Sequence, residues 1–131
     1  MSILKTTMTQ KNATQTLKLS PQLQSRLGIS LQTLTEFCQA HQITELAVFG
    51  SILRDDFNPK SDLDFLVTFH PQTKLSLMDL VGIQQQLEDL TGRKIDLLEK
   101  RAIENSHNWL RRQNILETAQ TIYESGHHLP A

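Results

Sequence analysis

Polar and apolar residues alternate most clearly along residues 62–69, which follow an Asn-Pro turn sequence. The odd-numbered positions of this stretch are leucine, phenylalanine and valine, and the even-numbered positions begin with Asp62 and Asp64. Successive side chains of a strand point to opposite faces, so the pattern predicts a strand with one packed face and both carboxylates on the other. Similar apolar runs predict further strands at residues 43–49, 94–98 and 121–123.

Apolar residues at helical spacing predict helices between these strands. Ser20 followed by Pro21 indicates one helix start and Ser30 another, because a serine hydroxyl accepts hydrogen bonds from the free amides of a helix N-terminus. Gly28 and Gly92 are suited to end helices, since glycine adopts a left-handed conformation without strain. The expected helices cover residues 21–28, 31–41, 51–57, 75–91 and 101–116, with a break allowed in the last one.

The helix at 31–41 carries an apolar stripe that we expect to cover the sheet, made of Leu31, Leu34, Phe37 and Cys38. The stripe of the helix at 75–91 is expected to consist mainly of Leu77, Leu80, Val81, Leu87 and Leu90. The helix at 101–116 is expected to bury Ile103, Trp109 and Leu110.

The chain has 131 residues, 38% of them hydrophobic, which is enough for one domain with a core of its own. The formal net charge is -1, so we expect neither direct binding of nucleic acid nor attraction to a membrane surface. The single cysteine, Cys38, is expected to be a buried thiol. No apolar run is long enough to cross a bilayer and the N-terminus lacks a signal-peptide core, which predicts a cytoplasmic protein. The expected organisation is a domain at 20–125, a flexible or partner-dependent segment at 1–19 and a tail at 126–131.

Candidate chemistry gathers at two neighbouring turns. Gly50-Ser51 ends the strand predicted at 43–49, where backbone amides and a hydroxyl can bind phosphate. Ten residues later, Asp62 and Asp64 project from one face of a strand, where their mutual repulsion favours a bound divalent cation such as Mg²⁺. Either motif alone has a simpler interpretation, since Ser51 can be only a helix cap and the aspartates only a solvated strand start. The two motifs together indicate a Mg²⁺-nucleotide site.

Asp96 is the third candidate carboxylate. It interrupts the apolar strand predicted at 94–98, and a charge in such a strand is costly unless it is paired or bound to a metal. It is therefore the natural third metal ligand, although pairing with Lys94 or Arg93 at a sheet edge is an alternative. Arg54 and Lys60 are close enough in sequence to neutralise phosphate charge.

Gly50-Ser51, ten residues, Asp62-Leu63-Asp64 and a later strand aspartate together resemble the minimal nucleotidyltransferases of the DNA polymerase β-like superfamily. The residues around both motifs look most like those of MntA-type antitoxins, which are partners of HEPN-domain toxins. The resemblance covers residues 31–123 and implies an α/β (α+β) fold, a small mixed sheet with helices packed on it.

The resemblance also implies a reaction, which is AMP transfer from ATP to a tyrosine of a HEPN RNase toxin with release of pyrophosphate. Asp62, Asp64 and Asp96 match the catalytic metal ligands for two Mg²⁺ ions, and Asp96 matches the group that deprotonates or orients the acceptor hydroxyl. The implied nucleotide-binding residues are Gly50, Ser51, Arg54, Lys60 and Ser61. The implied assembly is a hetero-oligomer with the toxin.

Two other functions stay open at this point. The protein can be an antitoxin that inhibits its toxin by contact alone, with the nucleotide site inactive. It can also be a transferase that modifies a small molecule of the aminoglycoside type. The larger relatives hold such acceptors with a C-terminal helical domain that we do not find here, so we expect the acceptor to come from a second protein or subunit.

Overall fold

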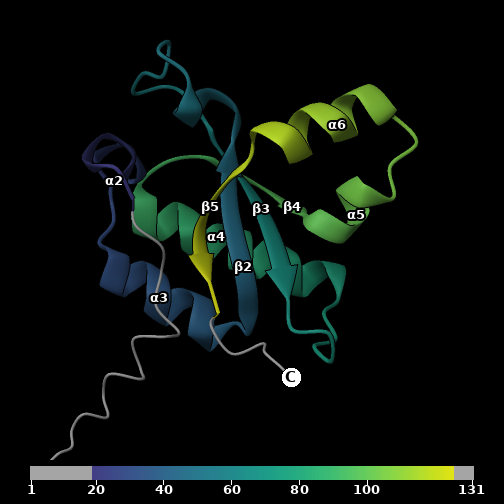
Figure 1. The fold of residues 1–131 in the computed structure, drawn as a ribbon. Coiled ribbons are helices and arrows are strands. Elements are labelled where there is room, and N and C mark those ends of the chain that lie inside the picture. Colours follow the sequence, from purple (N-terminus) through teal and green to yellow (C-terminus); the bar gives the residue numbers. More distant parts are fainter. Residues whose placement is uncertain (1–18, 126–131) are drawn as a thin grey trace, which may run out of the picture.

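The computed structural model describes residues 19–125 and contains one four-stranded sheet with helices on both of its faces (Figure 1). Each predicted strand is present, and the strand predicted at 43–49 has those bounds. The elements in chain order are α2 (Pro21–Leu27), α3 (Leu31–Ala40), β2 (Ile43–Phe49), the 3₁₀ turn η1 (Gly50–Leu53), β3 (Leu63–Phe69), α4 (Leu77–Thr91), β4 (Ile95–Glu99), α5 (Lys100–Glu104), α6 (Trp109–Thr118) and β5 (Gln120–Glu124).

The sheet is mixed, which confirms the predicted fold class. Its strand order is β4-β3-β2-β5; β2 pairs antiparallel with both β3 and β5, and β3 pairs parallel with β4. The connection from β3 to β4 passes through α4, as a parallel pair requires a crossover. This register places the first residues of β3 and β4 next to the last residues of β2, at the upper end of the sheet in Figure 1.

The predicted helix ends are confirmed by hydrogen bonds. The hydroxyl of Ser20 accepts from the amide of Leu23 at 3.1 Å, and that of Ser30 accepts from the amide of Thr33 at 3.0 Å. Gly28 and Gly92 follow α2 and α4 with φ angles of 74° and 72°, in the left-handed region that glycine tolerates. The break allowed in the last helix is also present, because α5 ends at Glu104 and α6 begins at Trp109.

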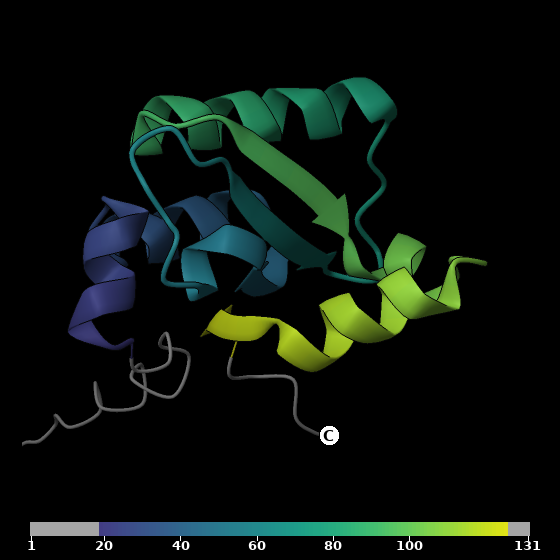
Figure 2. The ribbon, with the colours of Figure 1, turned by 90° about the horizontal axis from the view of Figure 1, so that it is seen from above.

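One face of the sheet packs against α2, α3 and α4 to form the larger core. Its centre contains Phe65 and Leu34, both with no exposed area, and Cys38 is buried there as predicted. Burial raises the pKa of the Cys38 thiol well above its usual range, so the thiol stays protonated. Figure 2 shows α4 on this side of the sheet and α6 on the opposite side.

The second face carries a smaller core beneath α5 and α6. Its buried residues are Ala47, Phe49, Leu66, Ile103 and Ile115. Ile103 was expected there, but the expectation that Trp109 and Leu110 are buried is wrong, since they are 58% and 65% exposed. The break at 105–108 shifts the register of α6, so Ile115 and Leu116 turn inward in place of the first two residues.

The predicted stripe of α4 is also partly wrong. Leu87 is buried, but Leu77, Val81 and Leu90 are exposed, and the second fully packed residue is Ile83. The buried line of α4 therefore runs through Ile83 and Leu87, which are four residues apart on one face. Polar residues on the neighbouring positions of that face contact β4 instead of solvent, as described below.

The predicted flexible segment 1–19 and tail 126–131 lie outside the described residues, apart from Leu19 at the boundary. Within the described part of the chain, no helix has both the length and the apolar composition needed to cross a bilayer.

Candidate active site

Gly50 and Asp64 meet where β2 ends. Phe49 is the register partner of Asp64 across the antiparallel pair, so the next residue, Gly50, passes directly over the Asp64 side chain. Gly50 has a φ of 78°, and a Cβ atom added there would collide with Asp64 Oδ2 and lie 3.3 Å from its Cγ. The position therefore requires glycine twice, for its backbone angle and for the space the carboxylate occupies.

Asp96 lies beside Asp64 on the neighbouring strand. The two are register partners in the parallel pair of β3 and β4, and residues at partnered positions point to the same face. Asp62 precedes them at the entrance to β3, so the structure brings all three predicted carboxylates to one end of the sheet. Asp64 is half-buried, and Asp62 and Asp96 are exposed.

The backbone on both sides of Asp96 is held by polar side chains from α4. The amide of Ile95 donates to Glu88 Oε2 at 3.1 Å, and the amide of Leu97 donates to Gln84 Oε1 at 3.2 Å. β4 is an edge strand of the described sheet, and these two bonds occupy outward amides that would otherwise lack a partner. Helix α4 thus fixes the strand that presents Asp96.

The alternative that Asp96 pairs with Arg93 or Lys94 is not what the structure shows. Among residues 19–125, Asp96 forms no ion pair, and the Arg93 guanidinium instead donates to the carbonyls of Asn58 and Ser61 at 3.1 and 2.9 Å. Arg93 also lies over the ring of Phe57, 4.3 Å from its centroid. Arg93 therefore organises the turn that leads into Asp62.

A second arginine holds the start of the same loop. Arg26 of α2 donates to the carbonyls of Ile52 and Arg54 at 2.7 and 2.8 Å. These bonds are consistent with the extended conformation of Arg54, and they coincide with a helical turn that stops at Leu53. The prediction of a helix over 51–57 is therefore wrong in its length, because only the 3₁₀ turn Gly50–Leu53 forms and the carbonyls of Ile52 and Arg54 accept from the Arg26 side chain.

The other predicted nucleotide-binding residues have different surroundings. Ser51 donates its hydroxyl proton to the Asp62 carbonyl at 3.2 Å, which ties the two motifs together. Ser61 accepts from the amide of Asn58 at 3.0 Å within the turn, and the side chain of Lys60 is exposed. Arg54 borders the site and forms a 3.3 Å ion pair with Asp56, in which both side chains are largely exposed. Their roles in binding remain predictions.

Electrostatics single out Asp64. Burial is the largest cause that raises the pKa of this carboxyl above its usual 3.8, and the nearby charges of Asp96 and Asp62 raise it further. Arg54 and Arg111 act in the opposite direction. A carboxylate that is destabilised by two like charges favours a bound cation.

The three carboxylates have the oxygen donors that a divalent ion needs, but their side chains do not converge on one point. Oxygen ligands on adjacent strands are what Mg²⁺ prefers, and none of the three forms an ion pair with another described residue. Within residues 19–125, however, no three acidic, histidine or cysteine side chains are placed so that they could together hold a metal ion. The chemistry of the donor set fits a divalent ion, but the side-chain positions in this structure do not form a metal site.

A cavity of about 580 Å³ adjoins the Gly50 turn. One wall consists of Phe49, Gly50, Leu53 and Arg54, and the other is a face of α6. The residues from α6 are Arg111, Asn114, Ile115 and Thr118. Sequence reasoning missed these residues because it followed only the apolar stripe of the helix. The available signal was the spacing of Arg111, Asn114 and Thr118, three and seven residues apart on one helical face.

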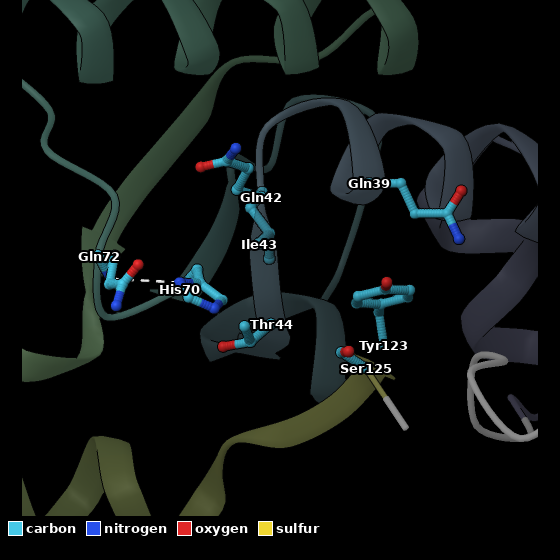
Figure 3. A pocket seen from close by; sticks show the side chains of 8 residues that line it. All are labelled: Gln39, Gln42, Ile43, Thr44, His70, Gln72, Tyr123 and Ser125. Atoms are coloured by element: carbon cyan, nitrogen blue, oxygen red, sulfur yellow. Dashed lines mark hydrogen bonds between the residues drawn. The ribbon is translucent and has the colours of Figure 1, made fainter. Parts of the chain in front are cut away.

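A second cavity, of about 520 Å³, lies at the opposite end of the sheet (Figure 3). Figure 3 shows His70 and Gln72 on one side of it and Tyr123 and Ser125 on the other. It contains none of the predicted site residues. The three carboxylates and the Gly-Ser turn lie at the other end of the sheet, together with Arg54 and Arg111, and we locate the candidate active site there.

Comparison with known proteins now assigns the family. Residues 31–122 match the family model described as the nucleotidyltransferase domain, which is more than half of the chain. The chain belongs to this family. The match includes all the predicted site residues and ends within β5, so the nucleotidyltransferase domain comprises the whole sheet and the helices from α3 to α6.

Two curated relatives illustrate how similar this nucleotidyltransferase is to known proteins. A protein of Methanocaldococcus jannaschii, named as an inferred protein adenylyltransferase, is 32% identical over 69 residues, 53% of this chain and 68% of that protein. The protein adenylyltransferase MntA of Thermococcus cleftensis is 28% identical over 85 residues, 59% of this chain and 84% of that protein.

Solved structures agree with the fold. A toxin-antitoxin crystal structure with AMP-PNP aligns at a TM-score of 0.57 and 16% identity, covering 72% of this chain and 73% of that one. A complex of a tri-AMPylated HEPN toxin from Shewanella oneidensis with its MNT antitoxin aligns at 0.53 and 15% identity, covering 79% and 73%. At these identities the likeness concerns the fold alone.

Proposed function

We propose that this nucleotidyltransferase is an antitoxin that transfers AMP from ATP to a tyrosine of a HEPN-domain toxin. Two findings on similar proteins support the proposal: the relative from T. cleftensis is named protein adenylyltransferase MntA, and a structural neighbour contains a tri-AMPylated HEPN toxin with its antitoxin. The observation that carries the proposal is the placement of Asp64 next to Asp96 and directly beneath Gly50.

In this proposal the Gly50-Ser51 turn binds the triphosphate. Glycine lets the backbone approach phosphate oxygens closely, and the Ser51 hydroxyl and nearby amides donate hydrogen bonds. Arg54 contributes positive charge from the wall of the cavity. From the turn that precedes Asp62, Lys60 contributes a second positive charge and Ser61 a hydroxyl. The loop that carries these groups is held by Arg26 and Arg93, so little ordering is needed when the nucleotide binds.

Asp62, Asp64 and Asp96 would hold Mg²⁺, for which we propose two ions. When bound, Mg²⁺ neutralises phosphate charge and stabilises the charge that develops on pyrophosphate. The acceptor's hydroxyl oxygen bonds to the α-phosphorus of ATP as the bond from that phosphorus to the bridging oxygen breaks, and pyrophosphate leaves. The proton of the hydroxyl passes to the exposed carboxylate of Asp96 and from there to solvent.

The proposed partner makes the working assembly a hetero-oligomer, and we propose a cytoplasmic location for it. The unit that performs the reaction is proposed to be residues 20–125.

The test is the intact mass of a HEPN protein that co-purifies with this chain, after incubation with ATP and Mg²⁺. We expect adenylate increments with the wild type and none with Asp62→Asn/Asp64→Asn or with a chelator. Asp89→Asn/Glu124→Gln, which changes two exposed acidic residues that belong to neither site motif nor the loop between the motifs, is the matched control and should modify the partner normally. A partner that binds equally to wild type and double variant, and that is unmodified in both, would show inhibition by contact alone.

A further inference from the structure

The α6 wall of the cavity next to Gly50 contains a positively charged side chain that has no role in the proposed reaction. Arg111 lines this cavity, and among the described residues its guanidinium has no hydrogen-bond acceptor or carboxylate partner. The neighbouring Arg112 differs, because its guanidinium donates to the Ser106 carbonyl at 2.7 Å and holds the turn before α6. Two adjacent arginines therefore have separate roles, one structural and one unassigned.

Contacts at both ends of its first turn hold the backbone of α6 at Arg111 in place. The Asn108 side chain caps α6 by accepting from the amide of Arg111 at 3.1 Å, and Ile115, one turn later, is buried in the smaller core. The first turn of α6 is thus fixed at its start and along its buried face. A guanidinium on a rigid helix loses less freedom when it binds a ligand than one on a mobile loop.

The charge pattern of the cavity identifies the ligand chemistry. Arg54, directly after η1, and Arg111 of α6 border the cavity, and the positive charge of each acts on Asp64. Arg54 already has an ion pair with Asp56, which leaves Arg111 the less engaged of the two. An anionic ligand fits between the arginines, and the planar guanidinium matches phosphate oxygens in two-point contacts. A volume of about 580 Å³ is in the range of small-ligand sites.

We propose that Arg111 positions the terminal phosphates of ATP and makes the site prefer a nucleoside triphosphate over a diphosphate. The inference rests on the proposed function for the identity of the nucleotide. It adds that the helix before the last strand, and not only the Gly-Ser turn, selects the substrate. Because Arg111 contacts the part of ATP on which negative charge develops as pyrophosphate leaves, its loss should weaken nucleotide binding and also lower the rate of transfer from bound ATP.

The test compares Arg111→Ala, Arg111→Lys and Arg111→Gln with Arg101→Ala, an exposed arginine of α5 that does not line the cavity. Calorimetry measures binding of AMP-PNP and ADP to the full chain, and transfer assays measure KM for ATP and kcat separately. For Arg111→Ala we expect binding of AMP-PNP about 10-fold weaker or more, with ADP binding changed much less. Lysine should restore part of the affinity, and glutamine should not. Arg101→Ala should behave as the wild type.

Each outcome separates the inference from the proposed function. An Arg111→Ala variant that folds normally and retains both its AMP-PNP affinity and its ratio of AMP-PNP to ADP affinity overturns the inference, even if the wild type transfers AMP. A wild type that binds AMP-PNP through Arg111 but modifies no HEPN partner overturns the proposed function and leaves the inference standing. If the wild type binds neither nucleotide, both are wrong.

Discussion

The two faces of the sheet differ in how completely they are packed. Among residues 19–125, the cluster beneath α2, α3 and α4 contains 17 buried side chains, whereas the cluster beneath α5 and α6 contains five. Asp64 and Asp96 lie on this less densely packed face. Two positions further along the same strands, on the same face, are Leu66 and Leu98. At the end of this face where an apolar residue would complete the core, the chain has carboxylates.

This difference shows how a small domain combines stability with an acidic site. The larger core supplies most of the buried apolar area, which is the main favourable term in folding. The smaller face can then leave one end unfilled, and the cavity between Gly50 and α6 results. The comparison predicts that equivalent changes on the two faces have different consequences.

The sharpest test uses two isoleucines of equal burial, Ile83 on the larger face and Ile115 on the smaller, which are 5% and 6% exposed. Truncation of either to alanine should lower the free energy of unfolding by about 2–4 kcal/mol, because it removes buried methyl groups and leaves a cavity. Only Ile115→Ala should also raise KM for ATP, since Ile115 separates Arg111 from Thr118 in the cavity wall. Denaturant unfolding and ATP kinetics measure the two effects. An equal change of KM in both variants would contradict the division between the faces.

Alanine substitutions at three glycines separate the two reasons for glycine at position 50, which are its backbone angle and the space taken by Asp64. Gly50→Ala should cost about 2–3 kcal/mol of stability and displace Asp64, because the substitution adds both backbone strain and a collision. Gly92→Ala has a similar φ but open space, so it should cost about 1 kcal/mol without loss of transfer. Gly82→Ala, in the middle of α4 with nothing near its Cβ, should stabilise by about 0.5–1 kcal/mol. Thermal unfolding and transfer assays on the three variants check this order.

A helix of the larger face also acts on the acidic site, through β4. Glu88→Ala leaves the Ile95 amide without its acceptor, which should cost about 1 kcal/mol and lower kcat because the strand that presents Asp96 is held less firmly. Gln85→Ala, an exposed neighbour with no side-chain hydrogen bond to a described residue, is the control and should change neither quantity. Unchanged kcat in Glu88→Ala, together with the expected loss of stability, would limit α4 to a structural role.

The smallest expected effect concerns the stability cost of Asp64 itself. Its pKa is raised above 3.8 in the folded protein, so the folded state binds the proton more tightly and stability falls as the pH rises from about 3.8 through the folded pKa. Asp64→Asn removes this cost and should raise the melting temperature by about 1–3 °C at neutral pH in the presence of a chelator. The gain should disappear below pH 3.8, where both states are protonated. Scans at several pH values measure it, and a gain that does not depend on pH would mean that charge is not the cause.

The strands, the caps and the mixed sheet could be predicted because they depend on local chemistry. The alternation from Asp62 to Phe69, the serines before α2 and α3 and the glycines after α2 and α4 each act within a few residues. The packed faces of α4 and α6 were predicted less well, since Trp109, Leu110 and Val81 are apolar but exposed. Helical spacing indicates a stripe, but a break such as that at 105–108 changes which side faces the sheet.

The motif residues of the candidate site could be predicted, but their surroundings could not. The proximity of Gly50, Asp64 and Asp96 follows from strand patterns and a recognisable spacing. The loop between the motifs was not predictable, because Arg26 and Arg93 reach its carbonyls from segments 26 and 32 residues away. Arg111 was missed because only the apolar positions of α6 were followed, and its contact with the cavity also depends on how α6 packs.

The bonds from Arg26 have a consequence for where the working unit begins. The family match starts at residue 31, yet Arg26 lies before it and bonds to the two carbonyls that follow the Gly-Ser turn. A fragment trimmed to the shared family region would retain every motif residue and lose this brace. In this protein α2 supports the loop that follows the Gly-Ser turn, so we expect a fragment that keeps this loop in place to begin before the family match, at α2.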